Sequence, residues 1–286
     1  MLTLLLDGIA YGMLLFVLAV GLAVTLGLMN FINLAHGAFA MAGGYVTVLL
    51  MNRLGVPFLA CLPLAFLFSA LLGAALEPLL YRRMYGKPHL DQVLFSIGIV
   101  FMAVTGVDYV VGSMQQNIQV PAWLQGRFAI EWAGIGKYRL FIIVVCAALT
   151  LALQWVLSRT RFGSQLRAAV DDPRVAGGLG LDVNRIFLLT FAVGSGLAGL
   201  GGALGAEILG LDPSFPLKFM IYFLIVVSVG GTTTITGPLL AALLLGIADV
   251  AGKYYIPDFG AFIVYSLMIV LLIWRPQGLF VRKGGK

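Results

Sequence analysis

Near the N-terminus, polar side chains interrupt an apolar stretch at positions suited to hydrogen-bonding a solute. Asn30, Asn33 and His36 recur at a spacing of three, which predicts that they lie along one face of a helix or helical end. Gly37 follows and permits close backbone approach or a break. A broken helix exposes free amides and carbonyls that bind both ends of a zwitterion. We interpret these four residues as candidates for a solute pathway; a hydrogen-bonded packing role and a gate are the alternatives for His36.

A second interrupted stretch, VSVGGTTTITGPLL, combines hydroxyls, glycines and a proline late in the chain. Its threonines supply replacement hydrogen bonds where glycine and proline interrupt a helix. Two interrupted segments in opposite halves of a membrane protein predict a central translocation site, and close helix packing is the alternative role for the glycines. The candidate pathway residues here are Gly230, Gly231, Thr232, Thr233 and Thr234.

A third segment, SRTRFGSQLRAAVDDPRVAGGLGLDVNRI, lies in the loop of about residues 158–186. Residues 165–170 are typical of a short helix. Asp172 and the proline after it start a second helix over 174–179, which Gly180 stops. Because the segment mixes arginine with alanine, valine and glycine, we expect a compact helical element that docks into another protein. A solvated loop without a partner is the alternative.

The remaining reactive side chains form no catalytic or metal-binding pattern. Cys61 and Cys146 lie far apart in apolar runs without CxxC spacing, so we expect buried thiols. His36 and His89 are the only histidines, and neither HExxH nor paired aspartates occur at a suitable depth. The sequence also contains no GxxxxGKS or GxxxxGKT phosphate-binding motif. We expect neither an enzyme nor a metal site, and no bound cofactor.

The elements that position these residues are predicted to be membrane-spanning helices. Of 286 residues, 61% are hydrophobic and 10% are charged, with a mean hydropathy of +1.03, whereas soluble domains have roughly a quarter charged residues. The net charge of +6 arises from short segments between apolar runs, which argues against nucleic acid as a partner. We therefore predict one all-α transmembrane domain over residues 1–286, embedded in a lipid bilayer.

The apolar runs predict a polytopic bundle of eight to nine spans. Two of them are short or broken, because the runs around 30–44 and 230–237 contain glycine and polar residues. The first run carries Asp7 and no early basic residue, so we interpret it as a retained span and not a cleavable signal. The candidate spans are 4–28, 36–52, 57–80, 91–112, 139–157, 186–206, 219–230, 238–254 and 259–274.

Basic residues predict the orientation of the bundle. Twelve of the 18 Lys and Arg residues lie after the third run, after the fifth run and at the C-terminus. By the positive-inside rule these segments, including the C-terminus, are cytoplasmic. The N-terminus is then outside with nine spans and inside with eight. The extracellular segment 112–137 is either a surface hairpin or a contact for an external binding protein.

The apolar runs lack ionisable residues in their middle. Acidic residues such as Glu77 and Asp249 fall near span ends, and no Lys or Arg lies mid-membrane. Proton-coupled carriers usually keep an ionisable relay at depth, so we expect the energy for transport to enter from outside the bilayer. A neutral polar lining favours solutes that are neutral or zwitterionic overall, such as amino acids or small amides.

Six stretches in order give the chain a close resemblance to a known family over essentially its full length. They are DGIAYG followed by GLAVTLGLMNFINLAHG, then EPLLYRRMYG, FGSQLRAAVDDPRVAGGLGLDVNRI, VGGTTTITGPLLAALLLGIAD and the terminal RPQGLF. In this order and spacing the chain resembles the LivH-type permeases of branched-chain amino acid ABC importers. The resemblance implies that NLAHG and GGTTTITGP line the central pathway.

The resemblance also implies that the chain lies in the inner membrane and works with a set of partners. These are a second, LivM-like permease, two cytoplasmic ABC ATPases of the LivG and LivF type, which use ATP and Mg, and an extracytoplasmic solute-binding protein. The loop from Gly163 to Gly180 corresponds to the family's ATPase-coupling segment. Its candidate coupling residues are Gly163, Arg167, Ala168, Asp171, Asp172, Ala176 and Gly180.

Two departures from the family pattern bear on the substrate. Ala38 stands where the family frequently has an acidic residue, and Thr232 to Thr234 stand in a run where glycines are common. Because relatives import urea, short amides and small carboxylates, these solutes are the alternative to branched-chain amino acids. A stand-alone channel or facilitator for small neutral solutes is the alternative from another class.

Overall fold

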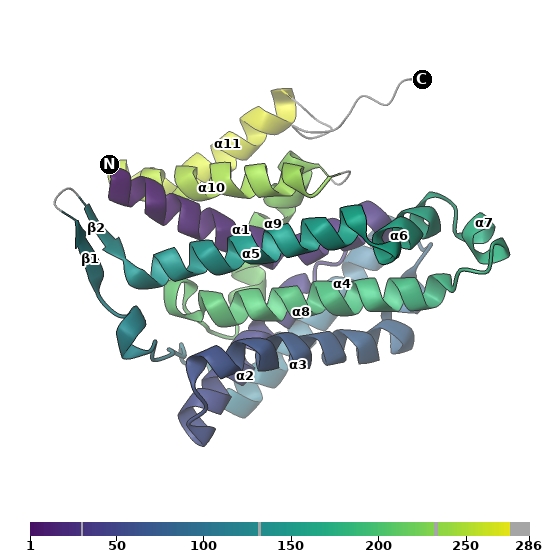
Figure 1. Cartoon of the computed structure of the whole chain (residues 1–286), viewed down its shortest axis with the longest axis horizontal. Coiled ribbons are helices and arrows are strands. Elements are labelled where there is room, and N and C mark those ends of the chain that lie inside the picture. The colour runs from purple at the N-terminus through teal and green to yellow at the C-terminus, as the bar shows by residue number, and fades with distance from the viewer. Residues whose placement is uncertain (30, 131–132, 232–233, 275–286) are drawn as a thin grey trace.

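A computed structural model describes residues 1–29, 31–130, 133–231 and 234–274. Within these ranges the chain is nearly all helical (Figure 1). The helices are α1 (Leu2–Met29), α2 (His36–Leu54), α3 (Phe58–Leu79), α4 (His89–Val111), α5 (Lys137–Arg159), α6 (Arg161–Asp171), α7 (Pro173–Gly178), α8 (Val183–Leu209), α9 (Phe215–Gly230), α10 (Thr236–Tyr255) and α11 (Gly260–Trp274). Short 3-10 turns cover Tyr81–Met84, Ala122–Leu124 and Pro257–Phe259.

The all-α prediction needs one correction, in the segment between α4 and α5. There β1 (Arg127–Ile130) and β2 (Ala133–Gly136) form an antiparallel pair with Arg127 opposite Gly136. Glycine, proline and polar residues interrupt this segment so that it does not continue a membrane helix, and the backbone groups of the two strands pair with each other. The predicted surface hairpin is thus present as a strand pair, and the contact with an external binding protein stays a prediction.

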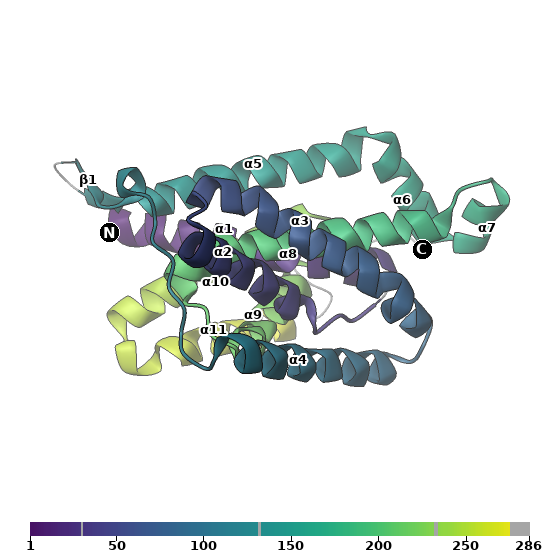
Figure 2. The same ribbon diagram turned by 90° about the horizontal axis from the view of Figure 1, so that it is seen from below.

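The long helices run between two ends of the molecule, as two perpendicular views show (Figure 2). One end holds the N-terminus, β1 and β2, and is called the hairpin end. The opposite end holds α6 and α7, and is called the α7 end. Such an arrangement suits a bundle that crosses a bilayer with a loop-rich surface on either side.

Six helices are long and apolar enough to cross a membrane, namely α1, α3, α4, α5, α8 and α10. The helical residues 215–230 and 262–274 are apolar but shorter, and α2 is not among the six although it has 19 residues. Every predicted run coincides with a helix to within a few residues. A multi-pass bundle is therefore confirmed in the part of the chain that the structure describes.

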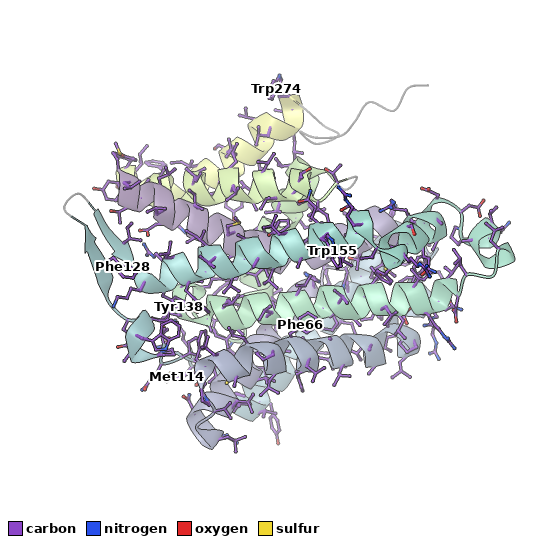
Figure 3. All side chains as sticks on the ribbon, in the orientation of Figure 1. Phe66, Met114, Phe128, Tyr138, Trp155 and Trp274 are labelled. Carbon is purple, nitrogen blue, oxygen red and sulfur yellow. The ribbon has the colours of Figure 1, made fainter. Side chains whose placement is uncertain are left out.

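Helices α1 and α8 form the centre of the bundle, and α4 and α5 lie at its edge. About three quarters of the apolar stretch is buried in the central pair, 78% for α1 and 72% for α8, against 11% for α4 and 17% for α5. The edge helices expose large apolar side chains, among them Leu94 of α4. Another is Trp155 of α5, which is labelled in Figure 3. An apolar exterior of this kind faces lipid or a partner helix.

Glycines allow the central helices to pack backbone against backbone. A Cβ at Gly43 of α2 would collide with Gly199 of α8, and a Cβ at Gly202 of α8 would collide with the Ala40 carbonyl of α2. Gly194 meets Gly21 of α1 in the same way. The glycine-rich run 194–205 therefore serves close helix packing, as small residues do in membrane bundles.

Candidate substrate and coupling sites

The first predicted pathway segment lies where α1 ends and the chain turns back into α2. Residues 31–35 are irregular, and the Ile32 amide donates to Gln92 Oε1 of α4 at 3.0 Å. Asn33 therefore lies before the helix and not on a helical face with His36, which corrects the spacing argument. The chain reverses here because α1 has spanned the bundle, and α2 begins at His36. Asn30 lies outside the described residues.

Asn33 and His36 are buried deep in the bundle. Their exposed fractions are 1% and 2%, and neither Asn33 Oδ1, Asn33 Nδ2 nor His36 Nε2 has a hydrogen-bond partner among the described residues. Buried polar atoms are nearly always paired, so three unpaired atoms at one place are unusual. These atoms are free to hydrogen-bond a solute that enters the bundle.

The imidazole of His36 lies at a crossing of several helices. It packs against Gly21 of α1, which also lies against Gly194 of α8, and its ring meets Phe223 of α9 edge-on with centroids 6.4 Å apart. Gly37, the next residue, lies against Pro216 at the start of α9. Movement of any of these helices would therefore shift His36.

The second predicted segment is interrupted as expected. Helix α9 ends at Gly230, Gly231 takes φ +78°, and α10 begins at Thr236. Gly230 packs directly on the backbone of Pro238, so it also serves close approach. Thr234 Oγ1 accepts from the Gly237 amide at 3.3 Å and lies 3.3 Å from Thr236 Oγ1. Thr232 and Thr233 lie outside the described residues.

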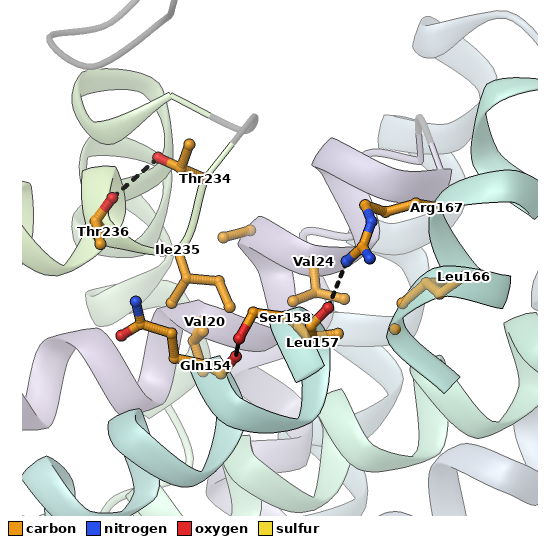
Figure 4. A pocket seen from close by; sticks show the side chains of 12 residues that line it. Val20, Val24, Gln154, Leu157, Ser158, Leu166, Arg167, Thr234, Ile235 and Thr236 are labelled. Carbon is orange, nitrogen blue, oxygen red and sulfur yellow. Dashed lines mark hydrogen bonds between the residues drawn. The ribbon is translucent and has the colours of Figure 1, made fainter. Parts of the chain in front are cut away.

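The structure brings Thr234 next to the predicted coupling segment at the α7 end. A cavity of about 360 Å³ is lined by α1, the end of α5, the start of α6 and Thr234 to Thr236 (Figure 4). Gly163 and Arg167 of α6 line the same cavity, and Arg167 Nη1 donates to the Leu157 carbonyl of α5. Asn33 and His36 are not part of its lining. The second pathway segment and the coupling segment therefore meet at this cavity, which the spacing of residues in the sequence did not predict.

The coupling segment has the predicted form of two short helices. The Thr160 side chain caps α6 by accepting from the Gly163 amide at 3.3 Å. Asp172 caps α7 by accepting from the amides of Arg174 and Val175, at 2.9 and 3.0 Å. Gly180 takes φ +86° beyond the end of α7, a conformation that other residues rarely adopt.

The predicted coupling residues divide into buried and exposed groups. Gly163 and Ala176 are buried, and Ala176 joins a small core with Leu166 of α6 and Ile186 of α8. These residues hold the element together. The exposed members are Arg167, Ala168, Asp171, Asp172 and Gly180.

Two apolar residues of this element were missed by sequence reasoning. Val175 and Leu179 are 58% and 78% exposed, although both are hydrophobic. They lie in and directly after α7, at the tip of the molecule (Figure 1). Apolar residues within an arginine-rich loop were the signal that could have identified them, because a solvated loop has no need of them.

A charged cavity at the hairpin end was also not predicted. It has a volume of about 410 Å³ and lies among α1, α5, α8, α9 and α10. Near it, Asp212 bonds Ser214 and Lys218. Burial raises the pKa of the Asp212 carboxyl, but these bonds outweigh that effect and hold the pKa below its ordinary value. The signal in the sequence was the presence of opposite charges at the same ends of separate spans.

Fold and sites together define a multi-pass membrane protein, an apolar helix bundle that buries a few polar side chains and carries two short helices at one end, as in a transport permease. A model of the family described as "Branched-chain amino acid transport system / permease component" matches residues 4–272. The chain belongs to this family.

Characterised relatives agree with this assignment. The chain is 28% identical to the high-affinity branched-chain amino acid transport permease BraD of Pseudomonas aeruginosa, over 97% of this chain and 95% of the relative. It is 30% identical to the probable branched-chain amino acid permease LivH of Methanocaldococcus jannaschii, over 93% and 86%. Its identity to the permease LivM of Salmonella typhimurium is 29%, over 92% and 67%. No solved structure matches the chain.

Proposed function

We propose that this chain is a permease subunit of an ATP-driven importer that carries branched-chain amino acids across the cell inner membrane. The observation that carries this proposal is the family match over residues 4–272. The chain has no phosphate-binding motif of its own, so ATP and Mg are used by two partner ATPases. A second, LivM-like permease and an extracytoplasmic solute-binding protein complete the importer.

In the membrane, we place the hairpin end outside and the α7 end in the cytoplasm. The arginines of α6, α7 and the start of α8 support this orientation through the positive-inside rule. Nine helices then cross or enter the membrane, with α2, α9 and α11 as the shorter ones. The C-terminal residues 275–286, which lie outside the described part, are cytoplasmic in this arrangement.

Coupling follows from the exposed face of α6 and α7. Val175 and Leu179 supply an apolar knob, and Arg167, Asp171 and Asp172 supply charges around it. An ATPase that binds this element more tightly in one nucleotide state than in another shifts the permease population between its outward-open and inward-open conformations. Because Arg167 also lines the cavity with Thr234, movement of α6 is transmitted to the interrupted segment between α9 and α10.

The unpaired atoms of Asn33 give a prediction for the pathway. Asn33→Leu is expected to leave thermal stability unchanged or slightly raised, because the amide makes no hydrogen bond to any residue that the structure describes. Uptake is expected to fall at least about tenfold, the equivalent of one lost solute contact of about 1.4 kcal/mol. Thermal unfolding of the purified chain and uptake by the reconstituted importer measure the two effects.

The control for this prediction is Asn52→Leu, the same substitution on the exposed end of α2. It should alter neither stability nor uptake. A destabilised Asn33→Leu variant with normal uptake would instead assign Asn33 a structural role.

The proposed function is tested by purifying the tagged chain from its native membrane and reconstituting what comes with it. Two ATPases and a second permease are expected, together with ATP-dependent leucine uptake in the presence of the binding protein. Undiminished transport by the chain alone would favour a stand-alone channel. Competition by urea, amides and small carboxylates in the same assay identifies the solute class.

A further inference from the structure

Five charged side chains converge on the cavity at the hairpin end, although they come from four helices. Arg139 of α5 pairs with Asp7 of α1, and Lys253 pairs with Asp249 on α10 at 2.6 Å. Lys218 of α9 also lines the cavity, while its partner Asp212 does not. Three cations therefore face the cavity with two carboxylates, and the carboxylate of the third cation, Lys218, lies outside the lining.

The acids and bases of this cavity differ in mobility. Asp249 is 2% exposed and is fixed from two sides, by Lys253 and by the Tyr222 hydroxyl at 3.3 Å. The side chains of Lys253 and Lys218 are both 56% exposed. Long, exposed lysines reorient at little cost, whereas the buried carboxylate stays in place. The cations can therefore turn from their present partners toward an anionic group that enters.

The cavity also has an apolar wall, formed by Ile208 of α8, Phe219 of α9 and Val250 of α10. An apolar wall beside a cluster of opposite charges matches a molecule with an aliphatic side chain and with an ammonium and a carboxylate group attached to the same carbon. A purely structural ion-pair cluster requires neither the apolar wall nor a cavity of about 410 Å³.

We propose that this cavity is an amino-acid binding site at the outer end of the permease, where the solute first enters the chain. The α-carboxylate binds Lys218 and Lys253, the α-ammonium binds Asp249, and the aliphatic side chain lies against Ile208, Phe219 and Val250. The solute is neutral overall. Its carboxylate replaces Asp249 as the partner of Lys253, and its ammonium replaces Lys253 as the partner of Asp249, so no uncompensated charge is buried. This inference rests on the proposed function, in which the hairpin end faces outward.

The test uses a Val250→Cys chain in nanodiscs of phosphatidylcholine and phosphatidylglycerol, labelled by a membrane-impermeant maleimide. Both native cysteines are fully buried, so labelling reports on position 250. Leucine at about ten times its dissociation constant should slow labelling about tenfold. Leucinol, which lacks the carboxylate, and 4-methylpentanoate, which lacks the ammonium, should protect far less.

Two substitutions in the Val250→Cys background remove the proposed contacts. Lys253→Met and Lys218→Gln should each abolish most of the protection by leucine. Lys253 is the ion-pair partner of Asp249, so its removal could disturb that carboxylate, whereas Lys218→Gln leaves the Lys253–Asp249 pair in place. The control Lys137→Gln lies at the same end, with its amine 5.3 Å from the centre of the Phe128 ring, outside the cavity. It should leave protection unchanged.

The proposal would be overturned if leucine did not slow the labelling of the Val250→Cys chain. It would also be overturned if leucine slowed labelling of both lysine variants as much as it slows labelling of the chain that keeps both lysines. Protection by phosphatidylethanolamine nanodiscs in place of leucine would also overturn it, because that headgroup combines an ammonium with an anion. ATP-driven leucine uptake by the assembled importer is measured in parallel. Uptake without protection rejects the site alone, whereas protection without ATP-driven uptake supports the site and rejects the proposed function.

Discussion

Gly202→Leu is expected to abolish the folded form of this permease. In the native packing a Cβ at Gly202 would already collide with the Ala40 carbonyl, and the facing Gly43 of α2 approaches Gly199 of α8 equally closely. Backbone atoms cannot move aside as a flexible side chain can. The cost should therefore exceed the roughly 3 kcal/mol of ordinary overpacking, because α2 would have to separate from α8 along their shared length.

The measurement is fluorescence-detected size-exclusion chromatography of the detergent-solubilised chain during a heating series. Gly202→Leu should give little or no monodisperse protein at any temperature. The matched control is Gly98→Leu on α4, where a Cβ meets nothing within 4 Å, and its stability should stay within about 0.5 kcal/mol of the native chain. Similar elution and melting of both variants would mean that the α2–α8 contact does not hold the bundle together.

A double substitution, Val175→Asp with Leu179→Asp, should uncouple the permease from the ATPases proposed as its partners. Both side chains are more than half exposed. Helix α7 is capped at its start by the Asp172 side chain and at its end through the backbone amide of Leu179, and neither substitution removes these groups, so the chain itself should fold normally. Loss of an apolar anchor at a protein interface costs about 2 kcal/mol or more, which weakens docking about 30-fold. ATPase retention on the tagged chain and ATP-driven uptake should both fall to that extent.

Leu54→Asp provides the control for this prediction. Leu54 is 71% exposed, close to Leu179 at 78%, but it lies at the end of α2, beside the segment that leads to β1. The same apolar-to-acidic change there should leave ATPase retention intact. Full retention of the ATPases by the α7 variant would show that they grip another surface.

Much of this fold was determined by local features of the sequence. Apolar runs of about 20 residues define membrane helices because lipid offers no partner to free backbone groups, and all nine predicted runs appear as helices. The interruptions before His36 and after Gly230 were equally readable from polar and glycine residues. The caps of α6 and α7 also act within a few residues, as the bonds from Asp172 illustrate.

What tertiary structure alone decided was which of these elements lie together. Helical periodicity describes a residue relative to its own helix, and in a chain with so much apolar surface it does not indicate which neighbour covers which face. Sequence therefore did not predict that Thr234 shares a cavity with Arg167, or that the Asn33 amide lacks a partner within the described part of the chain. Nor did it place Asp7, Arg139, Lys218 and Asp249 around one cavity, because a site assembled from residues far apart in the chain exists only once the helices have packed.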